Sequence, residues 1–450
     1  MNLNNIHNVY FVGIGGIGMS AIARYFASNG KKVAGYDKTA SQITLDLEDL
    51  GAEIHFEDAV KNIPISFLNI EKTLVVYTPA VSKNHAELSY FLENGFTVLK
   101  RAEILGKITE TTFCLAVAGT HGKTTTSAIL GHIMQEVNAT AFLGGIAENY
   151  DSNLILGADK VSVVEADEFD RSFLKLSPNI ACVTSMDADH LDIYGDAEAL
   201  NESFVEFANK VSGTLIVAKG LPLKGLTYAI NEVADYAASN LKIESGKYVF
   251  DVKTPSSEIK NIEFHLPGQH NVMNALAAIA MADVYGVSLD IIKKRLSTFK
   301  GVKRRFSYKI KTNDFVLIDD YAHHPTAINA VESSVREMYP NEKVLVVFQP
   351  HLFSRTKDFI EDFAVALSKF DEVLLLDIYP AREEPIVGVD SKWLLDKIDC
   401  KNKKLSKKNN LVKDIKNSLA SVVVMLGAGD VGLLVNEVRD ELLKTIENEV

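Results

Sequence analysis

A lysine and a threonine stand where a glycine turn would bring them onto the phosphates of a nucleotide. The stretch AGTHGKTTT, residues 118–126, follows an apolar run and opens a helix-forming stretch. Backbone N–H groups of such a turn point at an anion, and the helix dipole adds a favourable potential. Lys123 would reach the terminal phosphates and Thr124 a magnesium ion. The spacing G-x-x-G-K-T is shorter than the general phosphate-loop pattern, so a bare strand–helix turn is the alternative interpretation.

Carboxylates follow two later apolar runs and would supply metal ligands. The stretch SVVEADEFD, residues 162–170, ends in Glu165 and further acids, and CVTSMDADHLD, residues 182–192, ends in aspartates around His190. Hard oxygen ligands at a strand end suit Mg²⁺. Acidic runs in loops are usually only solvated. Two of them, each after a buried strand and downstream of a phosphate loop, favour a magnesium site.

The chain also opens on a glycine turn between a strand and a helix, in VYFVGIGGIGMSAIARYF, residues 9–26. Gly13, Gly15 and Gly18 match G-x-G-x-x-G, and Asp37 ends the next strand, about where a ribose ligand would lie. Taken alone, this pattern is typical of NAD binding. A UDP-sugar also offers a diphosphate beside a ribose, and a tight turn with no ligand is the remaining interpretation.

Histidines and an arginine follow two apolar runs in the last third of the chain. His323 and His324 lie in DDYAHHP, and His351 and Arg355 in FQPHLFSRT. Because the carboxyl ends of parallel strands hold the ligands of α/β sheets, we expect these side chains to face one cleft. The last glycine-rich stretch, GAGDVG at 427–432, is interpreted only as a turn.

The whole chain alternates strands and helices, which predicts parallel, doubly wound α/β sheets. Its 450 residues predict two or three domains, and the three α/β segments along the chain favour three in series, at 1–107, 108–310 and 311–450. The net charge of −12 argues against a general nucleic-acid binder. No apolar run approaches the ~20 residues of a membrane span. The three cysteines lack metal-ligand spacing and predict a reducing, cytoplasmic environment.

Taken in order, these stretches resemble the Mur ligase family, the ATP-dependent amino-acid-adding enzymes of peptidoglycan synthesis. The stretches that carry the resemblance are FVGIGGIGMSAIA, AGTHGKTTTSAIL, VEADEFDRSFL, ADHLDIYG, LPGQHNVMNALAAIA, GVKRRF, DDYAHHPTAI, FQPHLFSRTKDF and LGAGDVG. They run from residue 11 to residue 432, and their combination is specific. The short G-T-H-G-K-T loop is the form that this family uses.

The resemblance implies a Rossmann-like N-terminal domain, a central P-loop ATPase domain with a parallel sheet, and a C-terminal Rossmann-like α/β domain. It also implies the reaction of the members that join L-alanine to the lactyl carboxylate of UDP-N-acetylmuramic acid through an acyl phosphate. The first glycine loop would hold the UDP part of that substrate and the second would hold ATP. Two Mg²⁺ ions would accompany ATP, and a hinge near residues 299–312 would close the domains.

The resemblance further implies a set of site residues. ATP would contact Gly119, Thr120, His121, Gly122, Lys123, Thr124, Thr125, His270, Asn271, Asn274, Arg305 and Asp320. The UDP-sugar would contact Gly15, Gly16, Ile17, Asp37, Ser82, Asn84 and Arg101. Tyr321, His323 and Arg355 would bind the amino acid, and Thr124, Glu165 and His190 the metal. Lys123, His190, Arg305 and His323 would be catalytic. Leu352 stands where many relatives have an arginine.

The residues leave three alternatives. A sister ligase would add a whole peptide to the same sugar nucleotide, although its first loop usually lacks the GIGGIGMS form. An NAD-dependent oxidoreductase would use the first loop and leave Lys123 and Thr124 without a purpose. A P-loop ATPase with a mechanical or regulatory role would hydrolyse ATP without either co-substrate. Asn271 and Asn274, without the resemblance, would be read as helix-capping residues.

Overall fold

The computed structural model describes residues 3–82, 84–187, 194, 196–244, 247–381 and 383–448. The chain divides into two compact units. The first comprises residues 1–242, 249–264 and 273–300, and the second residues 243–248, 265–272 and 301–450. The domain boundaries at 107/108 and 310/311 stay predictions.

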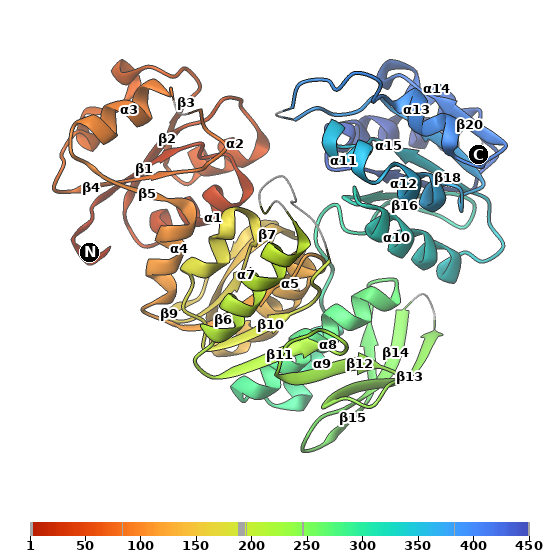
Figure 1. The fold of residues 1–450 in the computed structure, drawn as a ribbon, viewed down its shortest axis with the longest axis horizontal. Helices are drawn as coiled ribbons and strands as arrows, with labels where there is room; N and C mark the ends of the chain where they lie inside the picture. The colour runs from red at the N-terminus through yellow and green to blue at the C-terminus, as the bar shows by residue number, and fades with distance from the viewer. Residues whose placement is uncertain are drawn as a thin grey trace. The chain divides into compact units, whose positions relative to one another are not determined.

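Five parallel strands form the first sheet, in the order β3-β2-β1-β4-β5. They are β1 (Asn8–Val12), β2 (Lys32–Tyr36), β3 (Glu53–His55), β4 (Thr73–Tyr77) and β5 (Thr97–Lys100), with helices α1 (Ile17–Ser28), α2 (Gln42–Asp49), α3 (Ala86–Glu93) and α4 (Arg101–Thr109). Helix α3 covers one face of the sheet and α1 and α4 cover the other (Figure 1). Every residue of β1 is therefore buried, which explains its continuous apolar run.

Ten strands form the second sheet, in the order β15-β14-β13-β12-β11-β10-β6-β9-β7-β8. They are β6 (Phe113–Ala118), β7 (Ala139–Ala147), β8 (Ser152–Ile155), β9 (Ala158–Glu165), β10 (Ile180–Val183), β11 (Thr214–Ala218), β12 (Leu226–Ile230), β13 (Tyr236–Glu244), β14 (Lys247–Lys253) and β15 (Glu258–Phe264). The helices of this region are α5 (Lys123–Met134), α7 (Ala197–Asn209), α8 (Gln269–Tyr285) and α9 (Leu289–Leu296). The strands from β7 and β9 through β6 to β13 pair in parallel, and β8 is antiparallel to β7.

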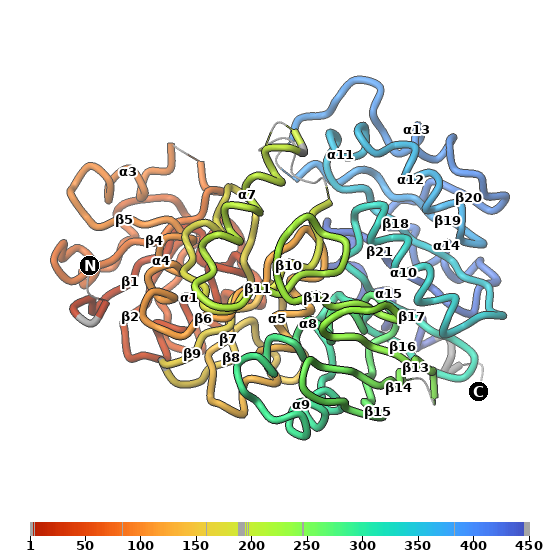
Figure 2. Tube along the Cα trace, turned by 60° about the horizontal axis from the view of Figure 1, so that its bottom comes forward, coloured from red at the N-terminus to blue at the C-terminus, as the bar shows by residue number. Residues whose placement is uncertain are grey.

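The part of this sheet from β12 to β15 was not foreseen from the sequence. Figure 2 shows these strands following one another at one edge of the sheet. In β14 the residues of KYVFDV alternate between half-buried and buried positions. That alternation is typical of a strand with one face exposed to solvent. It was the signal in the sequence from which β14 could have been predicted.

The first and second sheets share one hydrophobic core. It joins side chains of α1 and α4, such as Phe26 and Ile104, to those of the second sheet, such as Phe142 and Val164. The side-chain amide of Asn153 on β8 donates to the backbone oxygen of Ile17, at 2.5 Å. The two sheets therefore belong to one compact unit.

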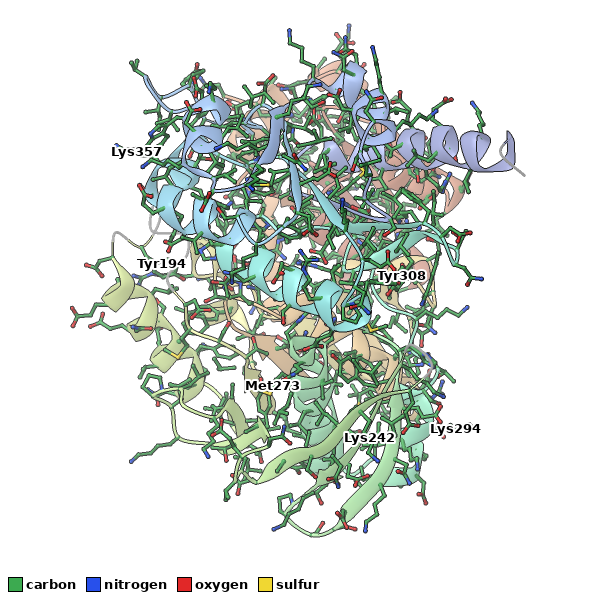
Figure 3. All side chains as sticks on the ribbon, turned by 90° about the vertical axis from the view of Figure 1, so that its right-hand side faces the viewer. Tyr194, Lys242, Met273, Lys294, Tyr308 and Lys357 are labelled. Atoms are coloured by element: carbon green, nitrogen blue, oxygen red, sulfur yellow. The ribbon has the colours of Figure 1, made fainter. Side chains whose placement is uncertain are left out.

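The third sheet has six strands in the order β16-β17-β21-β18-β19-β20. They are β16 (Ser307–Lys311), β17 (Val316–Asp320), β18 (Val344–Phe348), β19 (Glu372–Leu375), β20 (Asn402–Leu405) and β21 (Val422–Leu426). Its helices are α10 (Pro325–Met338), α11 (Phe353–Asp358), α12 (Ile360–Leu367), α13 (Ser391–Lys397), α14 (Leu411–Lys416) and α15 (Val431–Asn448). All its pairs are parallel except β16 with β17, and separate apolar cores cover its two faces. Tyr308 of β16 (Figure 3) accepts a hydrogen bond from the Tyr339 hydroxyl, at 3.3 Å.

Among the described residues, no helix combines the length and the apolar composition needed to cross a bilayer. All three cysteines are free thiols, as the sequence predicts. Burial raises the pKa of Cys114 and of Cys182 to about 12, so both stay protonated.

A buried carboxylate lies under α3 in the first domain. The side chain of Glu87 is fully buried and accepts hydrogen bonds from the Tyr10 hydroxyl, at 2.6 Å, and from the Ala59 N–H, at 3.2 Å. The His55 ring nitrogen lies 3.4 Å away. Burial raises the pKa of Glu87 to about 7, although these two hydrogen bonds oppose the shift.

We expect this carboxyl group to make the stability of the fold depend on pH. Because the folded state keeps the Glu87 proton up to about pH 7 and the unfolded chain loses it near pH 4.5, stability falls as the pH rises through this window. Glu87→Gln should remove this fall, which is at most about 3 kcal/mol. Urea unfolding at pH 5 and pH 8 measures it, with Glu93→Gln, an exposed position on α3, as the control. Parallel profiles for wild type and Glu87→Gln would contradict the prediction.

Candidate active site

The glycine turn before α5 is built as an anion site. Gly119 and Gly122 have φ of +129° and +83°, a conformation that side chains disfavour. The first hydrogen bond of α5 runs from the Thr126 N–H to the Gly122 oxygen, at 2.9 Å. The N–H groups of the preceding residues, among them Thr125, therefore have no partner within the helix and point to its N-terminal end. A phosphate group fits there.

Lys123, the first residue of α5, directs its ammonium group across this turn. Its Nζ donates to the Gly119 oxygen, at 2.6 Å, and lies 2.7 Å from Oε2 of Glu168. The Tyr194 hydroxyl (Figure 3) donates to the backbone oxygen of Glu168, at 2.5 Å. Burial lowers the pKa of Lys123, but Glu168 and two neighbouring carboxylates outweigh it, so the pKa lies above its usual value. The ammonium group is charged.

Thr124 and Glu165 present adjacent oxygens beside that lysine. The Thr124 hydroxyl donates to Oε1 of Glu165, at 2.9 Å, and the Gly144 N–H donates to Oε2, also at 2.9 Å. Within the described ranges, no cluster of three or more Asp, Glu, His or Cys side chains is placed to hold a metal ion. Mg²⁺ usually takes one or two carboxylates and completes its shell with phosphates and water. The hydroxyl–carboxylate pair fits such an ion.

The remaining predicted ATP contacts of the first unit surround the same turn. The Thr120 hydroxyl donates to the backbone oxygen of Asp187, at 2.9 Å, and Nε2 of His121 lies 3.2 Å from the Asp187 carboxylate. Oδ1 of Asn274 on α8 accepts from the Thr126 hydroxyl, at 3.2 Å. Gly122 leaves room for Asn274, since a Cβ at Gly122 would overlap Oδ1. The predicted metal ligand His190 lies outside the described residues.

The first glycine turn is braced by the aspartate at the end of β2. The Gly15 N–H donates to Oδ2 of Asp37, at 2.7 Å. A Cβ at Gly15 would lie 2.9 Å from the same oxygen, so only glycine admits this close approach. Gly16 precedes α1, which begins at Ile17. Asp37 therefore fixes the shape of the turn, and its expected contact with a ribose stays a prediction.

Two further predicted sugar-nucleotide residues, Ser82 and Asn84, lie in the turn after β4. The Asn84 N–H donates to the Ser82 hydroxyl oxygen, at 3.3 Å. Asn84 is exposed. Their side chains are available to a ligand at the carboxyl end of this strand, where α/β sheets hold ligands.

Arg101, at the start of α4, lies between α1, which follows the first glycine turn, and Asp167, which follows β9. Its Nη1 lies 2.9 Å from the position that a Cβ would take at Gly18. Its Nη2 lies 3.4 Å from Oδ2 of Asp167, two residues after Glu165. One guanidinium group thus contacts the helix that follows the first turn and the acidic strand end beside the second.

In the second unit, Asp320 binds the basic connector, the stretch FKGVKRRF at residues 299–306. Its carboxylate accepts the Phe306 N–H and the Ala322 N–H, each at 2.7 Å. Burial raises the pKa of Asp320 to about 6, and Arg305 opposes the shift. The Arg305 guanidinium lies over the ring of Tyr321, 5.1 Å from its centre. Arg305, Asp320 and Tyr321 therefore lie together, and the ATP role expected of the first two and the amino-acid role expected of Tyr321 stay predictions.

The histidines of this unit have two different roles. Nδ1 of His323 lies 2.9 Å from the backbone oxygen of Tyr321, and its ring contacts that of His351. Nη1 of Arg355, which is 8% exposed, lies 3.4 Å from Nδ1 of His351. His351 thus connects His323 to Arg355. His324 instead caps α10, because its Nδ1 accepts the Thr326 N–H, at 3.3 Å.

The start of α8 and the residue Leu352 complete the predicted set. The Asn271 side-chain amide donates to the backbone oxygen of Pro267, at 2.6 Å, which is the opposite direction to an N-capping bond. A Cβ at Gly268 would lie 2.6 Å from Cε1 of His270, so the turn fixes this ring at the helix start. Leu352 has φ of +74° and precedes α11, where it is 8% exposed.

Comparison with known proteins decides the family. The UDP-N-acetylmuramate–L-alanine ligase of Flavobacterium psychrophilum is 63% identical over 446 residues, which cover 98% of this chain and 99% of the relative. The chain belongs to the Mur ligase family. Models of three Mur ligase domains match in order: the catalytic domain at residues 8–112, the middle domain at 117–282 and the glutamate ligase domain at 304–435.

Solved structures of Mur ligases agree with the fold. The UDP-N-acetylmuramate–alanine ligase of Thermotoga maritima has a TM-score of 0.82 at 27% identity, over 98% of this chain and 100% of that one. A murein peptide ligase of Psychrobacter arcticus has a TM-score of 0.69 at 22% identity, over 97% and 98%, and shows the fold alone. The three-domain α/β architecture predicted from the sequence is confirmed, and the Mur ligase middle domain implies the use of ATP.

Proposed function

We propose that this Mur ligase is a UDP-N-acetylmuramate–L-alanine ligase of peptidoglycan precursor synthesis. The observation that carries the proposal is that both glycine turns lie in one compact unit, with Arg101 in contact with the helix after the first turn and with Asp167 after β9. A reaction between a sugar nucleotide and ATP needs two diphosphate sites close together. The high identity to a relative with this activity agrees with that chemistry.

The first step joins two anions. The lactyl carboxylate of UDP-N-acetylmuramic acid attacks the γ-phosphate of ATP, and ADP leaves as the acyl phosphate forms. Catalysis of such a step is mainly positioning and neutralisation of charge. Lys123 would move from Glu168 onto the phosphates, and Arg305 would approach from the second unit. Bound Mg²⁺, held by Thr124, Glu165 and His190, would neutralise phosphate charge, and we propose two ions.

The second step forms the amide. The amine of L-alanine attacks the acyl carbon through a tetrahedral intermediate, and phosphate leaves. Arg355 would grip the α-carboxylate with two parallel N–H donors. His323, whose ring lies between those of Tyr321 and His351, would face the amine and receive its proton.

Closure of the domains would complete this site, and we infer that the chain bends at Gly301. On one side, Asn149 holds the connector by donating to the Thr298 oxygen, at 2.8 Å, and accepting the Lys300 N–H, at 2.7 Å. On the other side, Asp320 holds the Phe306 N–H. Gly301, with φ of +116°, lies between these anchors and begins the last segment of the second unit.

Phosphate release tests the proposed function. With ATP and Mg²⁺ present, we expect release only when both UDP-N-acetylmuramic acid and L-alanine are added. Release without either substrate would favour an ATPase, and no release together with reduction of NAD would favour the oxidoreductase. Release with a peptide but not with L-alanine would favour the peptide-adding ligase. Each of these three outcomes would overturn the proposal.

A further inference from the structure

The glycine turn at 427–432 joins β21 to α15 and has the letters G-x-G-x-x-G, yet protein side chains occupy the space beside its glycines. A Cβ at Gly429 would lie 2.5 Å from Oε1 of Gln349 and 2.7 Å from the Tyr379 ring. The same Gln349 oxygen accepts the Val431 N–H, at 2.9 Å. A Cβ at Gly432 would overlap the guanidinium group of Arg304. Gln349 and Tyr379 therefore fill the space at the second glycine, where a dinucleotide loop admits a pyrophosphate, and Arg304 packs against the third.

Both the side chain and the backbone of Arg304 make contacts that fix its position. Its Nη2 donates to the Gly427 oxygen, at 2.5 Å, and its Nε lies 3.5 Å from Oδ1 of Asp319, which is almost fully buried. Its backbone oxygen accepts the Tyr321 N–H, at 2.7 Å. Its guanidinium lies 5.1 Å from the centre of the Tyr321 ring. Backbone and side chain thus fix the same tyrosine.

The connector is strained where these contacts fall. Arg304 has φ of +61° and Phe306 has φ of +49°, in the left-handed region that costs roughly 1–2 kcal/mol for a residue with a side chain. Such strain persists only where the surroundings over-determine it, and it concentrates at functional sites. Between these two strained residues lies Arg305, which therefore projects from a backbone whose shape is set on both sides.

The Tyr321 ring couples the position of Arg304 to that of Arg305. The guanidinium groups of Arg304 and Arg305 each lie 5.1 Å from its centre. A change in the place of Arg304 therefore moves the surface on which Arg305 rests. Displacement by about 1 Å of a group that positions a reacting phosphate costs as much as about 10²-fold in rate.

We propose that Arg304 is a positioning residue, gripped by the turn at 427–432, that sets Tyr321 and through it the phosphate-directed guanidinium of Arg305. The inference rests on the proposed function, because Arg305 is there a ligand of ATP. Arg304 itself has no contact with the substrates in this scheme. Its removal should lower kcat and leave the KM for ATP nearly unchanged, since the turn before α5 carries most of the ATP binding.

A double-mutant cycle tests the grip. Arg304→Ala removes the guanidinium, and Gly432→Ala displaces it while Arg304 stays. Each variant should lower kcat about 10- to 100-fold with less than a threefold change in the KM for ATP. The double variant should be no slower than Arg304→Ala, because the added methyl group then has no guanidinium to displace. Lys303→Ala, an exposed neighbour in the connector, is the control.

Two kinetic outcomes would overturn the proposal. One is a folded Arg304→Ala or Gly432→Ala enzyme with kcat within twofold of the wild type. The other is additive losses in the double variant, which would mean that the turn and Arg304 act independently. A merely structural role would lower the apparent kcat only through the loss of folded enzyme, so kcat normalised to the folded fraction would equal that of the wild type, and this result would also overturn the proposal.

A second measurement tests the positioning role of Arg304 independently of the proposed function. Hydrogen exchange of the amides at 304–306 and 321–322 follows the connector without any substrate. Arg304→Ala and Gly432→Ala should both speed this exchange, and Lys303→Ala should not. If wild type shows no ligase reaction, the proposed function fails, and unchanged exchange in the variants would separately refute the positioning role.

Discussion

Replacing Lys123 with methionine should reduce ATP-dependent phosphate release by about 10³-fold. In the proposed reaction its ammonium group would reach the phosphates from the first turn of α5, and removing a cation or donor that stabilises transferring phosphate typically costs 10²- to 10⁵-fold. The same substitution takes the ammonium away from Glu168, whose side chain is 1% exposed. Breaking a buried ion pair from one side costs about 3–5 kcal/mol, so the variant should also unfold more easily.

A double substitution separates these two effects. Lys123→Met with Glu168→Gln removes the buried negative charge along with the positive one, so it should recover most of the lost stability. It should not recover activity, because no ammonium group faces the phosphates. Single-turnover phosphate release and urea unfolding of the wild type and both variants measure the two quantities. A stable double variant with activity within tenfold of the wild type would refute the phosphate-binding role of Lys123.

Replacing Arg355 with lysine should raise the KM for L-alanine about 100-fold. A guanidinium group grips a carboxylate through two parallel bonds, whereas an ammonium group is a point charge at the end of a flexible stem. Arg355 is nearly buried and lies against His351, so in the proposed role it would offer a fixed donor pair to the α-carboxylate. A 100-fold change corresponds to about 2.7 kcal/mol, within the 2–5 kcal/mol that a buried charged contact contributes.

The selectivity of the change is the test of that role. The KM values for ATP and for UDP-N-acetylmuramic acid should stay within about twofold of the wild type, because their proposed sites use other residues. Lys357→Ala, an exposed cation on the same helix (Figure 3), should leave all three KM values unchanged. Equal increases for all three substrates in Arg355→Lys would indicate a general loss of structure and contradict an alanine-binding role.

Local sequence was enough to find the elements that carry the site. The runs that became β1 and β6 are apolar throughout because both faces of each strand are buried, and the glycines after them mark turns into helices. Lys123 and Thr124 follow directly from that local pattern. β14 was missed because its alternation lay between charged residues that resemble a loop.

Contacts between residues far apart in the chain could not be predicted from the sequence. Glu168 meets Lys123 and Arg101 meets Asp167 only because the strand ends of the folded sheets bring them together. Asp320 was expected near ATP, and its two bonds to backbone N–H groups depend on how the connector bends. The grip of the turn at 427–432 on Arg304 likewise needs residues 123 positions apart to meet.

The place of Arg101 has a consequence for the order in which substrates bind. Its guanidinium touches the helix of the sugar-nucleotide loop and pairs with Asp167 beside the ATP loop. If the two loops hold nucleotides as proposed, a diphosphate that draws Arg101 toward the first loop would weaken its hold on Asp167 and change the charge that a second nucleotide meets. Thermodynamic linkage would then require the two affinities to alter each other by the same factor. One half-buried arginine would make the two proposed nucleotide sites a cooperative pair.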